Sequence, residues 1–328
     1  MGNAFNKIYD IKKFGFNNVD WITVGDSKTD WGINHGELKN AQKNNNTNHV
    51  RFSLAGSNYM TIHSSIEWSM DNFINLDGIM LGMYEHEFFR YSNPDKEFKI
   101  SWPFRKYLDL NRFKYFKNVD AKFNFIQRTA LYNYLPDLKD FLVSPIKRFN
   151  ALESANKNWS NNLNFNINTK NNLCEYDLSS LSACVALANQ YKDKKSPKGF
   201  GSPIRNCGRQ TTIERLKTKQ WKTDPIDFER YFTEWTNLFN KVLNRNKKLT
   251  LILLPEYAYY DYMGKPSNAH IFIDNLKSKY ADKKNFEIID LRFLFKENDE
   301  CAYYSDVVHF NAKGAEKVTS AIINQFNK

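Results

Sequence analysis

Five short apolar runs, separated by segments of helical periodicity, constrain the fold of this chain more than any other feature. Several of the runs stop at a glycine or a proline, and they lie at 20–24, 49–54, 78–81, 249–254 and 286–291. Short apolar strands that alternate with helices predict one parallel sheet. The loops that follow the strands then share one edge of the sheet, where open α/β folds place their functional sites.

The segments beside these runs have the spacing of amphipathic helices. In 227–244, apolar side chains recur at steps of three and four residues, which is the period of a helix. Less complete patterns of the same kind predict helices at 31–38, 60–73, 271–280 and 311–326. We therefore expect a core that is formed by about 17–90 and 225–328.

Residues 91–224 interrupt this alternation. The chain has 328 residues, about twice the usual length of a single domain, which leaves room for a large insertion. The segment is rich in Asn, Lys and aromatic residues and has irregular periodicity. It predicts helices at 102–116, 123–142 and 178–191, and a loop at 195–203, where Pro and Gly interrupt regular structure. We expect a single α/β domain with a mostly helical cap inserted after the third strand.

The formal net charge of +11 is concentrated in this predicted cap. Ten Lys and Arg residues but only two acidic residues lie between Lys192 and Lys222. Such a segment can attract an acidic glycan, a lipid-linked phosphate, the phosphates of coenzyme A or nucleic acid, and it can equally be a solvated face. Nucleic acid is the weakest of these alternatives, because no recognition element accompanies the charge.

Composition also gives expectations about location and metals. No apolar run approaches the ~20 residues that cross a bilayer, and the first residues lack the apolar segment of a secretory signal. A cytoplasmic location is therefore expected. The four cysteines show no CxxC spacing, so we expect reduced, buried thiols and neither a zinc site nor a disulfide scaffold; they are Cys174, Cys184, Cys207 and Cys301.

Two motifs at the ends of the chain carry chemistry. Ser27 comes directly after the first apolar run, in Gly-Asp-Ser, and Asp306 and His309 stand three residues apart just before the last predicted helix. A serine hydroxyl becomes a nucleophile when an imidazole takes its proton and a carboxylate orients that imidazole. The alternatives without a catalytic role are a serine that caps a helix and a histidine at the surface or at a helix end.

The order and placement of these motifs resemble the SGNH (GDSL-type) ester hydrolases and acyl transferases, nearest to the branch that modifies polysaccharides. The resemblance covers about 17–90 and 225–328, and Asn311 and Gly314 continue its last motif. It implies a flavodoxin-like three-layer sandwich with a central parallel five-stranded sheet. It further implies that Ser27 is the nucleophile, that His309 is the general base and that Asp306 orients it.

The resemblance also assigns supporting roles. Asp26 is expected to tie the nucleophile loop together through hydrogen bonds, and Gly56 to donate its N–H to an oxyanion, unless it is only a turn glycine. The chain departs from the family where Gly-x-Asn-Asp is usual, because Tyr84 stands in place of the Asn. Tyr84 and His86 are the candidate replacement donors, and both can equally be packing residues. Lys28 stands where Leu is usual.

These residues predict a serine-dependent ester hydrolase that acts on a carbohydrate or a small acylated substrate through an acyl-enzyme. Two alternatives stay open: a polysaccharide O-acyltransferase of the same fold, for which acetyl-coenzyme A would be a donor, and a non-catalytic glycan-binding protein on a degenerate fold. No metal and no resident cofactor are expected, since phosphate loops, nucleotide fingerprints and zinc motifs are missing from the sequence. The oligomeric state is left open.

Overall fold

The structure of this chain is a computed structural model, and it describes two long parts of the chain that form one α/β unit. The described residues are 7–8, 11–12, 14–43, 47–54, 56–89, 104, 107, 174, 182, 225–257, 268–295, 300–305 and 308–326. The helices expected within 91–224 and the basic segment 192–222 lie outside them, apart from isolated positions. The predicted cap therefore stays a prediction.

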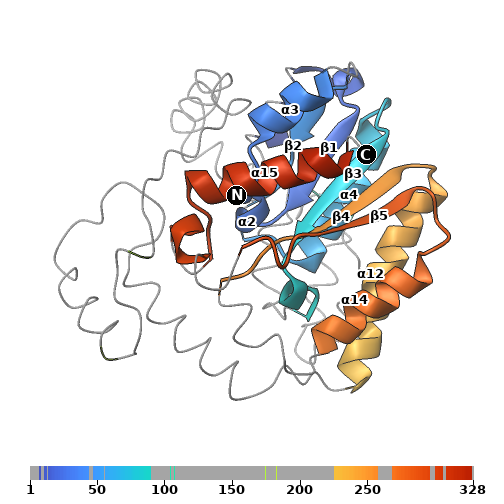
Figure 1. The fold of residues 1–328 in the computed structure, drawn as a ribbon. Helices are drawn as coiled ribbons and strands as arrows, with labels where there is room; N and C mark the ends of the chain where they lie inside the picture. The colour runs from blue at the N-terminus through green and yellow to red at the C-terminus, as the bar shows by residue number, and fades with distance from the viewer. Residues whose placement is uncertain are drawn as a thin grey trace, which may run out of the picture.

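Five parallel strands form the centre of the molecule (Figure 1). Their order in the sheet is β2-β1-β3-β4-β5, and each neighbouring pair is parallel. The strands are β1 Trp21–Gly25, β2 His49–Arg51, β3 Gly78–Met83, β4 Lys248–Leu253 and β5 Phe286–Asp290. This confirms the predicted five-stranded parallel sheet and its flavodoxin-like order.

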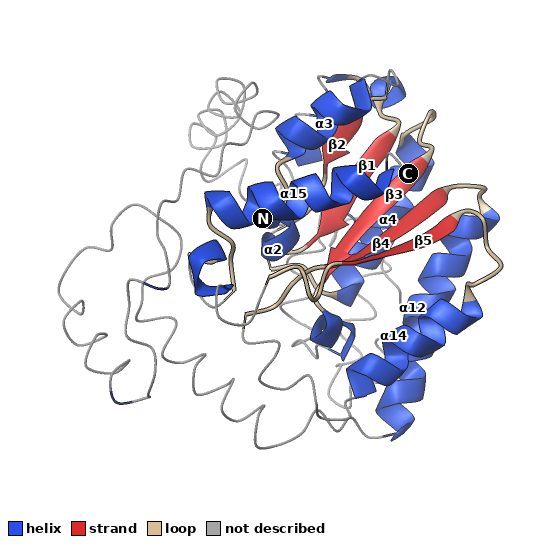
Figure 2. Ribbon diagram, viewed as in Figure 1, coloured by secondary structure: helices blue, strands red, loops and turns tan. Residues whose placement is uncertain are grey.

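Helices cover both faces of the sheet, as Figure 2 shows. The longer helices are α3 His35–Lys43, α4 Tyr59–Asn72, α12 Pro225–Asn244, α14 Asn268–Lys279 and α15 Ala312–Phe326. The short ones are α2 Ser27–Gly32 and the 3-10 turns η1 Phe16–Asn18, η2 Glu85–Phe89 and η6 Glu300–Tyr303. On one face α15 packs against α2 and α3, and on the other α12 packs against α4 and α14.

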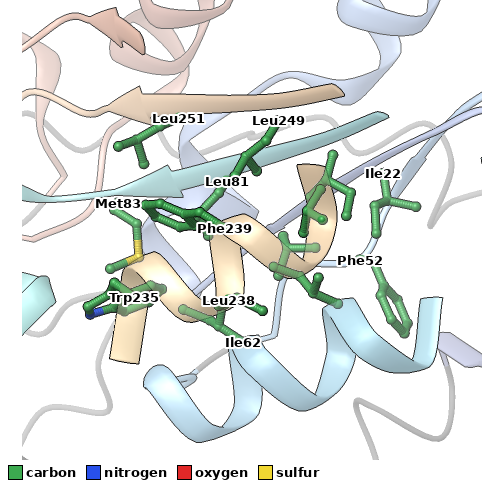
Figure 3. Close-up of a cluster of buried hydrophobic side chains, with 14 of the residues drawn as sticks. Ile22, Phe52, Ile62, Leu81, Met83, Trp235, Leu238, Phe239, Leu249 and Leu251 are labelled. Atoms are coloured by element: carbon green, nitrogen blue, oxygen red, sulfur yellow. The ribbon is translucent and has the colours of Figure 1, made fainter. Parts of the chain in front are cut away.

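The buried side chains divide into two clusters because successive strand residues point to opposite faces. Ile79 and Leu81 of β3 join the cluster under α4, α12 and α14, whereas Met80 between them joins the cluster under α3 and α15. Figure 3 shows the first cluster, in which Trp235 and Phe239 of α12 lie against the strands. The strands β1, β3 and β4 are buried almost throughout, which explains why they read as nearly continuous apolar runs.

Two element boundaries differ from those predicted. The helix expected at 31–38 is two helices, and the first begins at Ser27, immediately after the turn that ends β1. The carboxylate of Asp26 caps it, accepting a hydrogen bond of 2.8 Å from the Lys28 N–H. Strand β2 ends at Arg51, although the N–H groups of Phe52 and Leu54 still donate to carbonyls of β1.

Helix α2 packs closely against β1 and β3 because two paired glycines leave room for Thr29. Gly25 and Gly82 are register partners, and the Thr29 hydroxyl donates to the Gly82 carbonyl at 2.8 Å. A Cβ on Gly82 would lie 2.6 Å from the Thr29 side chain. A Cβ on Gly25 would also lie 2.7 Å from the Gly82 backbone oxygen. The two glycines let the turn that carries Ser27 pack against the sheet.

We expect Gly82→Ala to destabilise the protein by about 1–3 kcal/mol, because the added methyl overpacks the contact with Thr29. Thr29→Ala should restore part of that loss, since it removes the atoms that clash. Gly25→Ala should not be rescued in the same way, because its clash also involves backbone. Urea unfolding of the single and double variants measures this coupling. Additive losses for Gly82 and Thr29 would contradict the packing described here.

No helix in the part of the chain that the structure describes combines the length and the apolar character needed to cross a membrane.

The cysteines differ from the expectation of reduced thiols. Cys174 and Cys301 form a disulfide, with their Cα atoms 5.1 Å apart and a sequence separation of 127 positions. Sequence spacing gave no sign of this bond, because it joins segments that meet only in the fold. Disulfides persist mainly in oxidising compartments, and the cytoplasmic location stays an expectation from the sequence. Cys184 and Cys207 lie outside the described residues.

Candidate active site

Two segments far apart in the sequence meet at the carboxyl edge of the sheet. The Ser27 hydroxyl oxygen lies 3.1 Å from Nε2 of His309, although the residues are 282 positions apart. Ser27 is the first residue of α2, and His309 precedes α15, which packs against α2. Both residues are partly exposed. A hydroxyl and an imidazole at this distance have the geometry of a nucleophile and its base.

Hydrogen bonds and a backbone bridge hold the loop that carries His309. The N–H and the hydroxyl of Ser305 both donate to the His309 carbonyl, at 2.9 Å and 3.1 Å. Tyr304 and Phe310 form an antiparallel bridge across the base of the loop. These contacts fix the backbone from which the imidazole reaches Ser27.

Asn311 connects this loop to helix α15. Its side chain accepts a hydrogen bond from the Gly314 N–H and donates to the Ala302 carbonyl, each at 2.9 Å. A Cβ on Gly314 would lie 2.1 Å from the Tyr303 carbonyl oxygen, so only glycine fits there. The residues that continue the sequence motif are thus needed to seat the helix. Asp306 lies outside the described residues, and its contact with His309 stays a prediction.

Tyr84 contacts the loop that carries His309. It is 1% exposed, and its hydroxyl donates to the Val308 carbonyl at 2.8 Å. Burial, and then the nearby Tyr304 and acidic side chains, hold the pKa of Tyr84 well above its usual value, so the proton stays on the phenol. The hydroxyl is thus directed at the residue before His309. Its expected role as an oxyanion donor stays a prediction, and the observed contact supports the loop that carries His309.

Replacing Tyr84 with phenylalanine separates these two roles. If the hydroxyl only supports the loop, Tyr84→Phe should cost about 0.5–1.5 kcal/mol of stability through loss of its hydrogen bond to the Val308 carbonyl, with kcat lowered about tenfold or less. Loss of an oxyanion donor would instead lower kcat by about 10²- to 10³-fold. We expect the smaller effect. Ester turnover and thermal unfolding of the same variant give both quantities.

The other two predicted donors are placed less fully. Gly56 lies in a turn with φ of 79°, a left-handed conformation that favours glycine whatever its role. The turn follows β2 at the same edge of the sheet as Ser27, and the N–H of Ser57 donates to the Leu54 carbonyl across it. His86 belongs to η2, directly after β3, but its side chain lies outside what the structure describes. Donation by Gly56 or His86 stays a prediction.

Asp26 and Lys28 flank Ser27 in the sequence, and both are buried, as is Glu87, which pairs with Lys28. Lys28 Nζ is 2.6 Å from Oε1 of Glu87, and the other carboxylate oxygen of Glu87 accepts the Tyr84 N–H at 3.2 Å. Asp26 is 3% exposed. Burial, and then the adjacent Glu87, raise the pKa of Asp26 to about 7, although Lys28 opposes the shift.

Asp26 therefore makes the kind of loop contact that the resemblance implies, through its cap on the Lys28 N–H. Glu87 was not predicted as a site residue. The available signal was the unusual Lys28 next to Ser27: a lysine in a buried strand-to-helix turn needs an acidic partner, and Glu85 and Glu87 follow the neighbouring strand at the same edge.

A second cluster of charged side chains ties η2 to the end of β5. Arg292 donates to Glu85 at 2.6 Å and to both carboxylate oxygens of Asp290, at 2.8 Å and 2.7 Å. His270 Nδ1 lies 3.3 Å from the other oxygen of Glu85. Glu85 begins η2, whereas Asp290 ends β5. The turn that carries Glu87 is therefore tied to β5 as well as to α2.

Within the described ranges, no group of three or more His, Cys, Asp and Glu side chains could hold a metal ion.

No protein-family model and no curated protein matches the sequence of this chain.

Proposed function

We propose that this protein is a serine-dependent hydrolase of ester bonds that works through an acyl-enzyme, with the motif arrangement of the SGNH hydrolases. The observation that carries the proposal is the 3.1 Å contact between the Ser27 hydroxyl and His309 Nε2, formed by residues from opposite ends of the chain. The α/β sheet places this pair at its carboxyl edge, where folds of this class bind substrates.

In the first half of the proposed reaction, the Ser27 oxygen attacks the ester carbonyl while its proton passes to His309 Nε2. The tetrahedral intermediate carries a negative oxygen, for which the N–H groups of Ser27 and Gly56 are the proposed donors. When the intermediate collapses, the C–O bond to the alcohol breaks and the alcohol leaves with the proton from His309. The acyl group remains on Ser27.

In the second half, water takes the place of the alcohol. His309 removes a proton from the water as its oxygen attacks the acyl carbon, and returns that proton to Ser27 when the acid leaves. A sugar hydroxyl in place of water would give an acyl transferase with the same residues. The substrate class, an acylated carbohydrate or a small acylated molecule, is proposed from the sequence.

Acetate release and acetyl transfer, measured side by side, test this proposal. We expect the protein to release acetate from acetylated oligosaccharides or p-nitrophenyl acetate, and to lose this activity in His309→Gln. Transfer from acetyl-coenzyme A to an oligosaccharide without acetate release would show the transferase instead. Binding of oligosaccharides with neither reaction would overturn the enzyme proposal in favour of a glycan-binding protein.

A further inference from the structure

The pair formed by Lys28 and Glu87 is the most buried ion pair next to the proposed nucleophile. Their side chains are 5% and 6% exposed, and the charged atoms lie 2.6 Å apart. Lys28 directly follows Ser27, whereas Glu87 is 59 positions further along the chain, in η2. The pair therefore joins the turn after β1 to the turn after β3.

Both charges have additional contacts that leave them little freedom. The Lys28 ammonium lies 3.9 Å from the centre of the Tyr84 ring, and its backbone N–H donates to Asp26. Glu87 also accepts the N–H of Tyr84. An ammonium held between a carboxylate and an aromatic face has a defined direction and distance, which an apolar side chain in the same space would not have.

Stability alone is a poor explanation for this pair. Burying two charges costs several kcal/mol per ion, and apolar residues of similar volume are often as stable or more stable. A leucine or methionine at position 28 could fill the same space without that cost. What the ion pair adds is geometry, because it fixes the first turn of α2 relative to η2. Tyr84 extends this connection, since its hydroxyl donates to the Val308 carbonyl in the loop that carries His309.

We propose that Lys28 and Glu87 are positioning residues: their ion pair holds the Ser27 hydroxyl at the correct distance from His309. This inference rests on the proposed function. It predicts an effect on kcat rather than on substrate binding, because neither charged group needs to touch the substrate. A displacement of about 1 Å between reacting groups can cost on the order of a hundredfold in rate.

Four variants and a control test the inference by ester turnover and urea unfolding. Glu87→Gln and Lys28→Met each remove one charge and leave the other buried, so both should lose about 3–5 kcal/mol of stability. Their kcat should fall about 10- to 100-fold with KM little changed. Lys28→Arg, which keeps the cation, should recover most of kcat. The control is Glu67→Gln, which breaks a similarly close ion pair with Lys241 between α4 and α12 and should leave kcat unchanged.

The double variant Lys28→Met with Glu87→Gln gives the decisive readout, and it remains measurable if a single variant fails to fold. Removing both charges should restore much of the stability. If the pair positions Ser27, kcat stays about 10- to 100-fold low in this folded protein. Recovery of kcat together with stability would overturn the inference and leave a purely structural pair.

The wild-type assay separates this inference from the proposed function. Turnover that depends on Ser27 and is unchanged in the double variant overturns the positioning role alone. The absence of any turnover that depends on Ser27 overturns the proposed function, and the positioning role with it.

Discussion

Replacing Ser27 with alanine should lower kcat for ester hydrolysis by about 10⁴- to 10⁶-fold. In a nucleophile and base that act as a unit, removal of either member costs nearly the whole rate advantage of the pair. His309→Gln should therefore show a loss of similar size, and the double variant should lose little more than either single variant. Steady-state turnover of one ester substrate with all three proteins measures this.

Ser69→Ala is the matched control for this experiment. Ser69 is also a helical serine whose hydroxyl is removed, but it lies in the last turns of α4 and donates to the Ser65 carbonyl within that helix. It should retain wild-type kcat. Losses for Ser27 and His309 that simply add, or a Ser27→Ala protein with near wild-type activity, would contradict the proposed pair.

Acid should destabilise the protein through two buried histidines. Burial lowers the pKa of His49 to about 3, and burial, followed by the nearby side chains of Arg51, His49 and Lys7, holds the pKa of His35 well below its usual value. Above a pH of about 6.5 both histidines are neutral in both states, so they do not affect stability. Below it the unfolded chain binds protons that the folded protein cannot, and stability is lost as pH falls toward 3.

The loss amounts to about 1.4 kcal/mol per pH unit for each histidine, or on the order of 5 kcal/mol for His49 by pH 3. His49→Gln should remove that contribution, because a neutral amide can keep the 2.6 Å contact with the Thr23 hydroxyl without titrating. The free energy of unfolding, measured by urea at several values of pH, should then fall less steeply with acid in the variant than in the wild type.

Asp26 gives the opposite sign and serves as an internal check. Its folded pKa is raised to about 7, so between pH 4 and 7 the folded state holds a proton that the unfolded state releases. Its contribution to stability is present at low pH and is lost as pH rises through that window. Asp26→Asn should therefore remove the loss of stability that the wild type shows as pH rises from 4 to 7.

A His49→Gln profile parallel to the wild type from pH 6.5 to 3 would contradict the buried, neutral state of His49.

Much of the fold could be predicted from the sequence because a parallel sheet buried on both faces has a strong signal. The runs that form β1, β3 and β4 are almost wholly apolar and stop at Gly or Pro, and α12 repeats Trp235, Leu238 and Phe239 at helical steps. The start of α2 was missed for a local reason. The residues Gly25 and Asp26 are as typical of a turn as of a helix start. In the structure the Asp26 side chain caps the helix, so α2 begins at the next residue.

The candidate site was predictable only in part. Ser27 and His309 have residue types and positions that point to one reaction, and the sheet order brings them together. The partnership of Lys28 with Glu87 had only the unusual Lys28 as a signal, because the contact itself depends on how closely α2 and η2 approach. The disulfide of Cys174 is the same kind of case, since a contact between distant segments leaves no trace in local spacing.

The central claim is that Ser27 is an activated nucleophile, and covalent labelling tests it most directly. A fluorophosphonate reacts with a serine whose proton can be taken by a neighbouring base. We expect one adduct per chain, mapped by mass spectrometry to the peptide that contains Ser27, absent from Ser27→Ala and strongly slowed in His309→Gln. Absence of an adduct on the folded wild-type protein, or equal labelling of Ser27→Ala, would contradict the account.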